Sequence, residues 1–311
     1  MSDETACTFV SSRGILKSCD YHSANPKSSC ATDTGYLSDM LRGSPTPMRD
    51  GMSIYVCSDL LRYFVTAILP KMSRKFVLVS GDSDMCVPSE ALTEKETVTL
   101  LHSSLLCHWF AQNLQIRGEH PKMTALPIGL DYHTIAANPR HHWRMQREGC
   151  KPVEQEKILC EVAAGAAIAA DADARNDRVY VNFSLSNDRF GQRRESVCAI
   201  PRELLSICQD VVPRTRGWQR CATHRFVLSP FGMGMDCHRT WEALSLGCVP
   251  IVCDAPHFSV MFYGLPVLQV SSWSEVTREC LDAFDYSAAN TLPEKLLLSY
   301  WVSAIRTAGC A

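Results

Sequence analysis

The sequence predicts an α/β protein made of two Rossmann-like halves with a cleft between them. Short apolar runs alternate with amphipathic stretches along most of the 311 residues, a pattern typical of parallel sheets covered by helices. Polar and basic residues 138–151 interrupt this rhythm once, and it then restarts. At roughly 150 residues per domain the length fits two units. We therefore expect an N-terminal domain over 1–150, a C-terminal domain over 151–288, and a helix in 289–311 that packs back across the domains.

In the first half, bounded apolar runs predict four strands: Ser53–Cys57, Lys75–Ser80, Leu105–Phe110 and Met123–Ile128. Asp59–Leu69 has helical character, and Pro70 is expected to end that helix. The Ala-rich stretch Pro152–Ala170 predicts a further helix, and 172–178 a charged turn.

In the second half, the expected strands are Arg178–Ser184, Arg225–Ser229, Cys248–Cys253 and Pro266–Val270. The expected helices between and after them are Gln192–Ala199, Arg202–Cys208, Cys237–Leu246, Ser274–Phe284 and Pro293–Thr307.

Composition excludes several classes of protein. With 31 basic and 33 acidic residues, the balanced charge argues against a nucleic-acid partner. No apolar run approaches the length of a membrane-spanning helix. The polar N-terminus lacks an apolar signal, so we expect a cytoplasmic protein, in the host cytoplasm if the chain is viral. The 16 cysteines are scattered without a CxxC pair and are expected to be free thiols.

The most informative segment reads as strand, glycine loop, helix and strand over residues 224–253. Gly232 and Gly234 allow close approach of the backbone to a ligand, Asp236 is the expected N-cap of the helix, and Gly247 its C-terminal stop. A helix N-terminus after a glycine loop suits a diphosphate. A simple tight turn is the alternative interpretation.

His238, Arg239 and Glu242 are spaced to share one side of that helix, placing cations in its first turn and a carboxylate one turn later. The cations suit phosphate and the carboxylate suits ribose hydroxyls. The glycine spacing is not GxGxxG, and the acid stands on the helix rather than after the next strand, which argues against an NAD-dependent dehydrogenase.

The stretch SPFGMGMDCHRTWEALSLGCVPIV (229–252) resembles the donor-binding segment of exostosin-like glycosyltransferases, which have the GT-B fold. HPKMTALPIGLDYHT (120–134) and FYGLPVLQVSSWSEVT (262–277) are similar to the same family, and within it to the chlorovirus-encoded xylosyltransferase type. The resemblance implies an inverting, metal-independent transfer from a UDP-sugar, with xylose as one candidate. An oligosaccharide or glycoprotein glycan would be the acceptor, and no cofactor would be needed.

The same resemblance implies a set of donor-binding residues. Glu242 would bind the ribose, and Arg193 and Arg194 would neutralise phosphate after a strand that ends at Asn182 to Ser184. The remaining donor-site residues would be Asn182, Ser184, Ser229, Pro230, Gly232, Met233, Gly234, His238 and Arg239.

Asp82 and Asp84 follow the strand KFVLVS directly, where side chains of a parallel sheet face the ligand. An inverting sugar transfer needs one base to deprotonate the acceptor hydroxyl. The family often carries a small-polar-Ser-Asp stretch here, so Asp84 is our first candidate for the base and Asp82 the second. An Asx turn that merely ends the strand is the structural alternative.

Two rival functions use the same residues. In a GT-A-like transferase, Asp82 and Asp84 would hold Mn²⁺ or Mg²⁺ against the diphosphate; the glycine-loop helix makes that metal redundant, so we expect none. A non-catalytic nucleotide- or glycan-binding module would keep Glu242 without needing a base.

Further polar residues complete the prediction. Asp131, Tyr132 and His133 follow the run MTALPIGL and are expected to contact the acceptor. A basic cluster farther along the chain is expected to be ordinary surface: Arg214, Arg216, Arg220 and Arg225.

Overall fold

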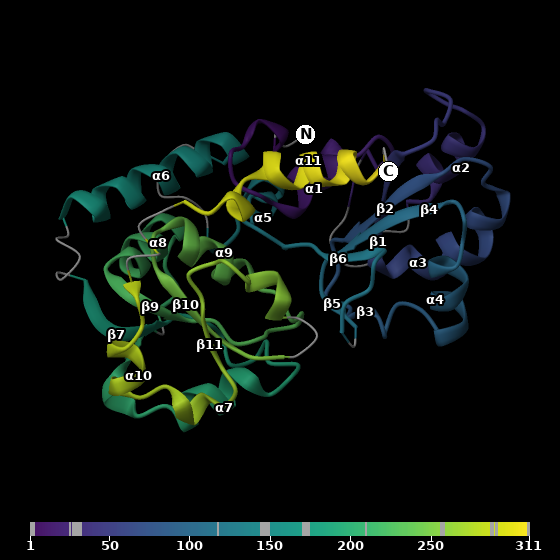
Figure 1. Ribbon diagram of the computed structural model, residues 1–311. Coiled ribbons are helices and arrows are strands. Elements are labelled where there is room, and N and C mark those ends of the chain that lie inside the picture. Colours follow the sequence, from purple (N-terminus) through teal and green to yellow (C-terminus); the bar gives the residue numbers. More distant parts are fainter. Residues whose placement is uncertain are drawn as a thin grey trace.

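The computed structural model describes residues 4–24, 26, 33–116, 118–143, 150–169, 175–208, 210–255, 259–286, 289 and 292–309. Within them lie two larger parallel sheets, each flanked by helices, so the predicted α/β class is confirmed (Figure 1). The first sheet uses residues from 52 to 125 and the second residues from 176 to 270. The polar segment 138–151 and helix α6 (Pro152–Ala169) separate them in sequence.

The first sheet has the order β1-β2-β4-β6, with every neighbouring pair parallel. A two-stranded parallel sheet, β3 (Val87–Pro88) with β5 (Leu114–Gln115), lies beyond its carboxyl ends. The four predicted strands are present, although the last is shorter than expected. Their bounds are β1 (Met52–Cys57), β2 (Phe76–Gly81), β4 (Leu106–Ala111) and β6 (Met123–Ala125).

Alternation along these strands explains why helices cover both faces of the first sheet. Leu78 belongs to an apolar cluster with α2 (Gly35–Leu41), α3 (Leu61–Tyr63) and α4 (Glu94–Leu101). Val79, its neighbour, belongs to a second cluster on the opposite face. That face is covered by α1 (Ser12–Ser18) and α11 (Leu298–Gly309), which lie side by side (Figure 1).

The helix predicted after β1 is present but irregular. The chain winds from a 3₁₀ turn (Ser58–Leu60) through α3 into a π-helical stretch (Phe64–Ile68). Pro70 lies inside the final 3₁₀ turn, Leu69–Lys71, rather than after it. A proline is tolerated there because a helix end leaves backbone groups unpaired in any case.

The second sheet has the order β11-β10-β9-β7-β8, again all parallel. From β7 the chain moves one way to β8, and from β9 it moves the other way to β10 and β11. The carboxyl ends of β7 and β9 therefore flank the point where strand order reverses, which is where open α/β sheets bind ligands. The bounds are β7 (Asn176–Val181), β8 (Leu205–Ile207), β9 (His224–Leu228), β10 (Val249–Cys253) and β11 (Leu268–Val270).

Two helix predictions in this half need correction. Arg202–Cys208 is not a helix: after the 3₁₀ turn Arg202–Leu204, the chain forms β8, because pairing with β7 buries Leu205. Within Ser274–Phe284, only α10 (Arg278–Asp282) is α-helical, because the side chain of Thr277 caps a new start there. The helices α7 (Gln192–Ala199) and α9 (His238–Ser245) agree with prediction. The α-helix predicted over Pro293–Thr307 begins only at Leu298, as α11, and α8 (Arg214–Ala222) has no counterpart among the predicted helices.

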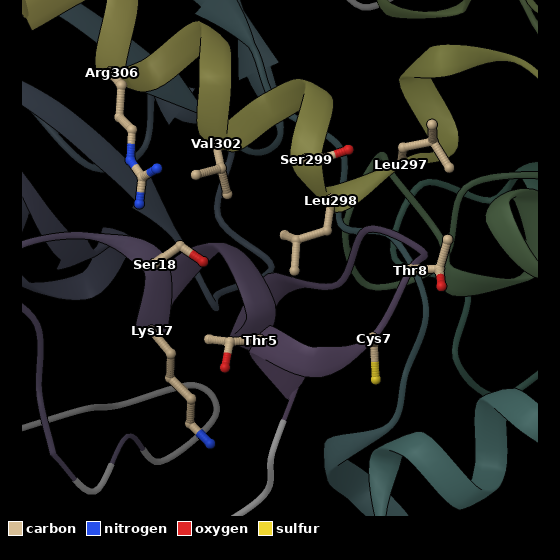
Figure 2. A pocket seen from close by; sticks show the side chains of 10 residues that line it. All are labelled: Thr5, Cys7, Thr8, Lys17, Ser18, Leu297, Leu298, Ser299, Val302 and Arg306. Carbon is tan, nitrogen blue, oxygen red and sulfur yellow. The ribbon is translucent and has the colours of Figure 1, made fainter.

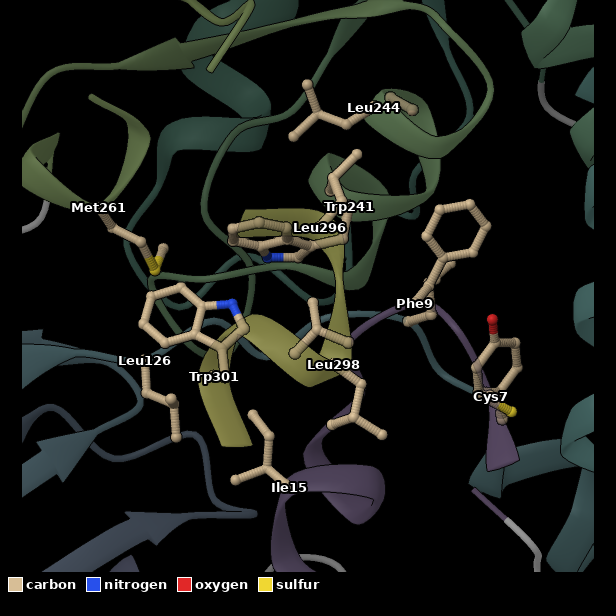
Figure 3. Packing of buried hydrophobic residues seen from close by; sticks show 14 of the residues in the cluster. Cys7, Phe9, Ile15, Leu126, Trp241, Leu244, Met261, Leu296, Leu298 and Trp301 are labelled. Atoms are coloured by element: carbon tan, nitrogen blue, oxygen red, sulfur yellow. The ribbon is translucent and has the colours of Figure 1, made fainter. Parts of the chain in front are cut away.

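An apolar cluster shared by the two units joins them. Trp241 and Leu244 of α9 belong to the same buried cluster as Trp301 of α11 and Ile15 of α1 (Figure 3). Leu296, in a 3₁₀ turn (Glu294–Leu296), lies between these helices. The last part of the chain thus leaves the second unit and packs on the first sheet.

Two expectations concern the chain as a whole. None of the 14 cysteines that the structure describes is part of a disulfide, in agreement with the expected thiols. No helix in the described ranges combines the length and apolarity that crossing a membrane requires.

Candidate active site

Most residues predicted to bind the donor lie near the carboxyl ends of β7 and β9. Asn182 and Ser184 follow β7 and are exposed, and the glycine loop 230–236 follows β9. The hydroxyl of Ser229 is buried and bonded to Oγ1 of Thr240 at 2.7 Å, which ties the strand end to α9. Pro230 is buried, whereas Met233 is exposed.

Two arginines meet over one aromatic ring in this region. The guanidinium carbons of Arg193 and Arg239 lie 5.5 and 5.0 Å from the ring centroid of Phe183. Arg193 donates to the carbonyls of Phe231 and Ser184, and Arg239 to the amide oxygen of Asn182. These acceptors are all uncharged.

The two guanidinium groups lie close together, and the hydrogen bonds described above pair them with neutral oxygens only. Nη1 of Arg239 is buried and has no hydrogen-bond partner among the described residues. Burial lowers the pKa of Arg239 and the charge of Arg193 adds to this effect, whereas Cys237 and Glu242 oppose it. Two like charges held together with an unused donor form a site suited to an anion.

Gly232 is required by this arrangement. A Cβ atom at Gly232 would stand 2.4 Å from Nη2 of Arg193, so only glycine lets the guanidinium lie against the loop. The neighbouring Arg194 differs from Arg193: its residue is exposed, and its N–H is bonded to the carboxylate of Asp188. Asp188 also accepts the N–H of Arg193 and so fixes the start of α7.

The start of α9 departs from prediction. The N-cap residue is Cys237, not Asp236. Asp236 is buried, and its carboxylate accepts two hydrogen bonds. One comes from the indole N–H of Trp241, and the other, of 2.7 Å, comes from the main-chain N–H of Ile128 in the first unit. Burial raises the pKa of Asp236 to about 6 against these hydrogen bonds. The side chain that was expected to cap the helix instead joins the two units.

His238, Arg239 and Glu242 were expected to share one side of α9, but their side chains contact three different groups. Nδ1 of His238 lies 2.7 Å from the carbonyl oxygen of Gly129 in the first unit, so this nitrogen donates to that oxygen. Arg239 turns toward Phe183. Glu242 is partly exposed, with Oε1 3.9 Å from Nε of Arg214.

On the first unit, Asp82 and Asp84 have different environments. Asp82 has φ +56° and a buried side chain, and its two oxygens each lie 3.3 Å from the guanidinium of Arg13. Burial raises its pKa to about 6, although Arg13 opposes this. Asp84 is exposed, yet partial desolvation raises its pKa against the pull of His238 and Arg189.

The metal alternative for this loop relies on the carboxylates of Asp82 and Asp84. The carboxylate of Asp82 already faces Arg13. Across the described ranges, no group of three or more His, Cys, Asp or Glu residues is arranged to hold a metal ion.

The predicted acceptor residues Asp131, Tyr132 and His133 differ in how exposed they are. Tyr132 is fully buried and its hydroxyl donates to Glu156 at 2.7 Å, so the expectation that it contacts an acceptor is wrong. The carboxylate of Glu156 also accepts the main-chain N–H groups of Thr8 and Phe9, so Tyr132 is part of a buried hydrogen-bonded group. Asp131 is buried, and His133 keeps 17% of its side-chain surface exposed.

Arg214 explains the state of Asp131. Burial alone would raise the pKa of Asp131, but Arg214, His133, His238 and the N–H of Thr134 together hold it below its usual range. Arg214 is itself buried, 2.9 Å from Oδ2 of Asp131, and its guanidinium carbon lies 5.9 and 5.7 Å from the ring centroids of Trp143 and Trp218. The prediction that Arg214 belongs to the ordinary surface is therefore wrong.

Sequence reasoning also missed Asn113. The rule that selected Asp82 and Asp84, a polar residue after a buried strand, applies equally to Gln112 and Asn113 after β4. By contrast, nothing local distinguishes Arg13 or Arg214 from surface arginines.

A separate cavity of about 500 Å³ opens between α1 and α11 (Figure 2). Lys17 and Arg306 line one end, and Leu298 and Val302 form its apolar side. None of the predicted site residues lines it.

Comparisons with known proteins complete the description. No protein-family model matches the sequence, and no curated protein is similar enough to match. AviGT4, a glycosyltransferase involved in avilamycin A biosynthesis, is similar in structure with TM-score 0.34 and 11% identity, over 81% of this chain and 89% of that chain. The N-terminal domain of Candida albicans trehalose-6-phosphate phosphatase gives TM-score 0.37 and 11% identity, over 88% of this chain and 73% of that one. The GtfA/B complex is similar with TM-score 0.31 and 13% identity, over 82% of this chain and 61% of that chain.

Proposed function

We propose that this protein is a glycosyltransferase that moves a sugar from a nucleoside diphosphate sugar to an acceptor hydroxyl. The observation that carries the proposal is the pair Arg193 and Arg239 at the carboxyl ends of β7 and β9. There the strand order reverses, and two guanidinium groups, one with an unused buried donor, lie near the N-terminal end of a helix. Both features favour a diphosphate.

The remaining parts of the donor site follow from this position. Glu242 stands one turn along α9 from the arginine and would bind the ribose, as the exostosin-like resemblance of residues 229–252 implies. We assign UDP as the nucleotide and xylose as the first sugar to test on that resemblance alone. Arg193 and Arg239 would supply the charge that a metal supplies in other transferases, so we expect no metal requirement.

Asp84 is the proposed base. It is exposed, follows β2 and has a raised pKa, which makes its carboxylate a better proton acceptor near neutral pH. Asp82 is the weaker candidate because Arg13 occupies its carboxylate. A single base in an attack on the anomeric carbon without a covalent intermediate would invert the anomeric configuration.

The test is incubation of the full chain with UDP- and GDP-sugars, with and without a mixed glycan acceptor, in buffer that contains EDTA. We expect slow release of UDP from one UDP-sugar, faster release with acceptor, and no loss in EDTA. Binding of UDP without any turnover would indicate a non-catalytic module. Activity that disappears in EDTA and returns with Mn²⁺ would favour a metal at Asp82 and Asp84.

A further inference from the structure

Asn113 connects the loop of the proposed base to the loop of the proposed donor site. Its side chain is buried, and Nδ2 donates to the carbonyl oxygen of Ser83 at 3.0 Å. Oδ1 accepts the main-chain N–H of Asp236 at 2.9 Å. One side chain thus bonds both to the residue before Asp84 and to the residue two before α9 begins.

The surrounding backbone is adapted to hold Asn113 in this position. Its φ of +50° lies in the left-handed region, which asparagine tolerates better than most residues. The carbonyl oxygen of Asn113 also accepts the N–H of Val87. Gly234 of the donor loop leaves room for the amide, because a Cβ there would stand 3.1 Å from Nδ2.

A second contact joins the same two loops from the other unit. Arg189 donates its main-chain N–H to the carbonyl of Gly232 and a guanidinium N–H to the carbonyl of Asp84, the latter at 3.3 Å. It also pairs with Glu90 at the surface. The carbonyls of Ser83 and Asp84 are therefore both bonded by side chains that are fixed to the glycine loop.

We propose that Asn113 is a positioning residue that sets where the carboxylate of Asp84 lies relative to the bound donor. This inference rests on the proposed function. Because the amide is bonded on both sides and buried, it transmits the position of the donor loop to Ser83 and so to Asp84. A displacement of about 1 Å between reacting groups is enough to lower turnover by about 10²-fold.

Asn113→Gly is the decisive variant, since glycine accepts the positive φ and removes both side-chain hydrogen bonds. We expect kcat to fall at least tenfold while the Kd for UDP stays within twofold. Ser89→Ala is the matched control: it removes an exposed hydrogen bond to Gln115 but leaves both bonds of Asn113 and the contact of Arg189 with Asp84, and we expect kcat within twofold of wild type. Thermal unfolding of each variant shows that it is folded.

A double variant separates positioning from a general structural effect. If Asn113 acts through Asp84, then Asn113→Gly adds less than twofold to the loss in an Asp84→Asn background. Equal effects in both backgrounds, or wild-type turnover in Asn113→Gly, would overturn the inference and leave the proposed function standing. A wild-type protein that turns over no nucleotide sugar would overturn the proposed function and the inference with it.

Should Asn113→Gly fail to fold, Asn113→Asp takes its place. Aspartate still accepts the N–H of Asp236 but cannot donate to Ser83 when ionised, so the same loss of kcat with unchanged UDP affinity is expected.

Discussion

Arg214 and Asp131 form a buried ion pair of 2.9 Å that joins the second unit to the first. Nε of the same guanidinium lies 3.9 Å from Oε1 of Glu242, the residue proposed to bind the ribose. Glu242 therefore contacts an arginine that is held in place by Asp131 of the first unit. Arg214 neutralises part of the charge of Glu242 yet leaves that carboxylate partly exposed. The proposed donor site and the predicted acceptor residue Asp131 are therefore linked by one cation, Arg214.

Replacing Glu242 by alanine is expected to weaken UDP binding by roughly 2–3 kcal/mol, the scale of hydrogen bonds to a charged group. Calorimetry with UDP and with inorganic diphosphate measures it, because only UDP carries the ribose. Unchanged UDP affinity in a folded Glu242→Ala protein would contradict the assignment.

Asp84→Asn keeps the shape of the side chain and removes its basicity, so turnover is expected to fall by about 10²–10⁴-fold with the donor Kd within a few-fold of wild type. Asp82→Asn should lower turnover less but lower stability more, by about 3 kcal/mol, because it leaves the buried guanidinium of Arg13 without its carboxylate. Steady-state rates and urea unfolding of both variants check this. The opposite ranking of rates would make Asp82 the base.

Arg239→Met is expected to weaken UDP binding about tenfold or more and to leave uridine binding unchanged, since only UDP carries the diphosphate. Arg194→Met is the comparison on the neighbouring helix, and its exposed side chain predicts a much smaller loss. Equal losses in the two variants would mean that general surface charge, rather than the pair over Phe183, attracts the nucleotide.

His133 is expected to make stability depend on pH. Burial lowers its pKa from 6.5 to about 4, against the effect of Asp131. The unfolded chain therefore takes up this proton near pH 6.5 and the folded chain only near 4. The free energy of unfolding is thus highest above pH 6.5, where His133 is neutral in both states, and it falls as the pH decreases toward 4. Relative to His133→Gln, the wild type should lose about 2 kcal/mol of unfolding free energy between pH 7 and pH 5. A difference that stays constant with pH would show that His133 titrates normally.

The sequence predicted best what depends on local pattern. Apolar runs bounded by turn residues located the strands on either side of Asp82 and of the glycine loop, because burial of both sheet faces demands such runs. Tyr132 was misplaced because the pattern shows that a strand has ended but not which way the next side chains turn. Arg13 and Arg214 were missed because their partners, Asp82 and Asp131, are distant in sequence, and only the closed fold brings them within 3.3 and 2.9 Å.

Helix α11 has a consequence for the order in which the protein can mature during synthesis. It supplies Leu298, Trp301 and Ile305 to the face of the first sheet that α1 only partly covers. Since the ribosome makes the chain from its N-terminus, β1 to β6 must wait, with that face open, until the entire second unit has been translated. Strands formed early are thus covered by residues made after the whole second unit, and nascent chains stopped before residue 298 are expected to be substrates for chaperones and proteases.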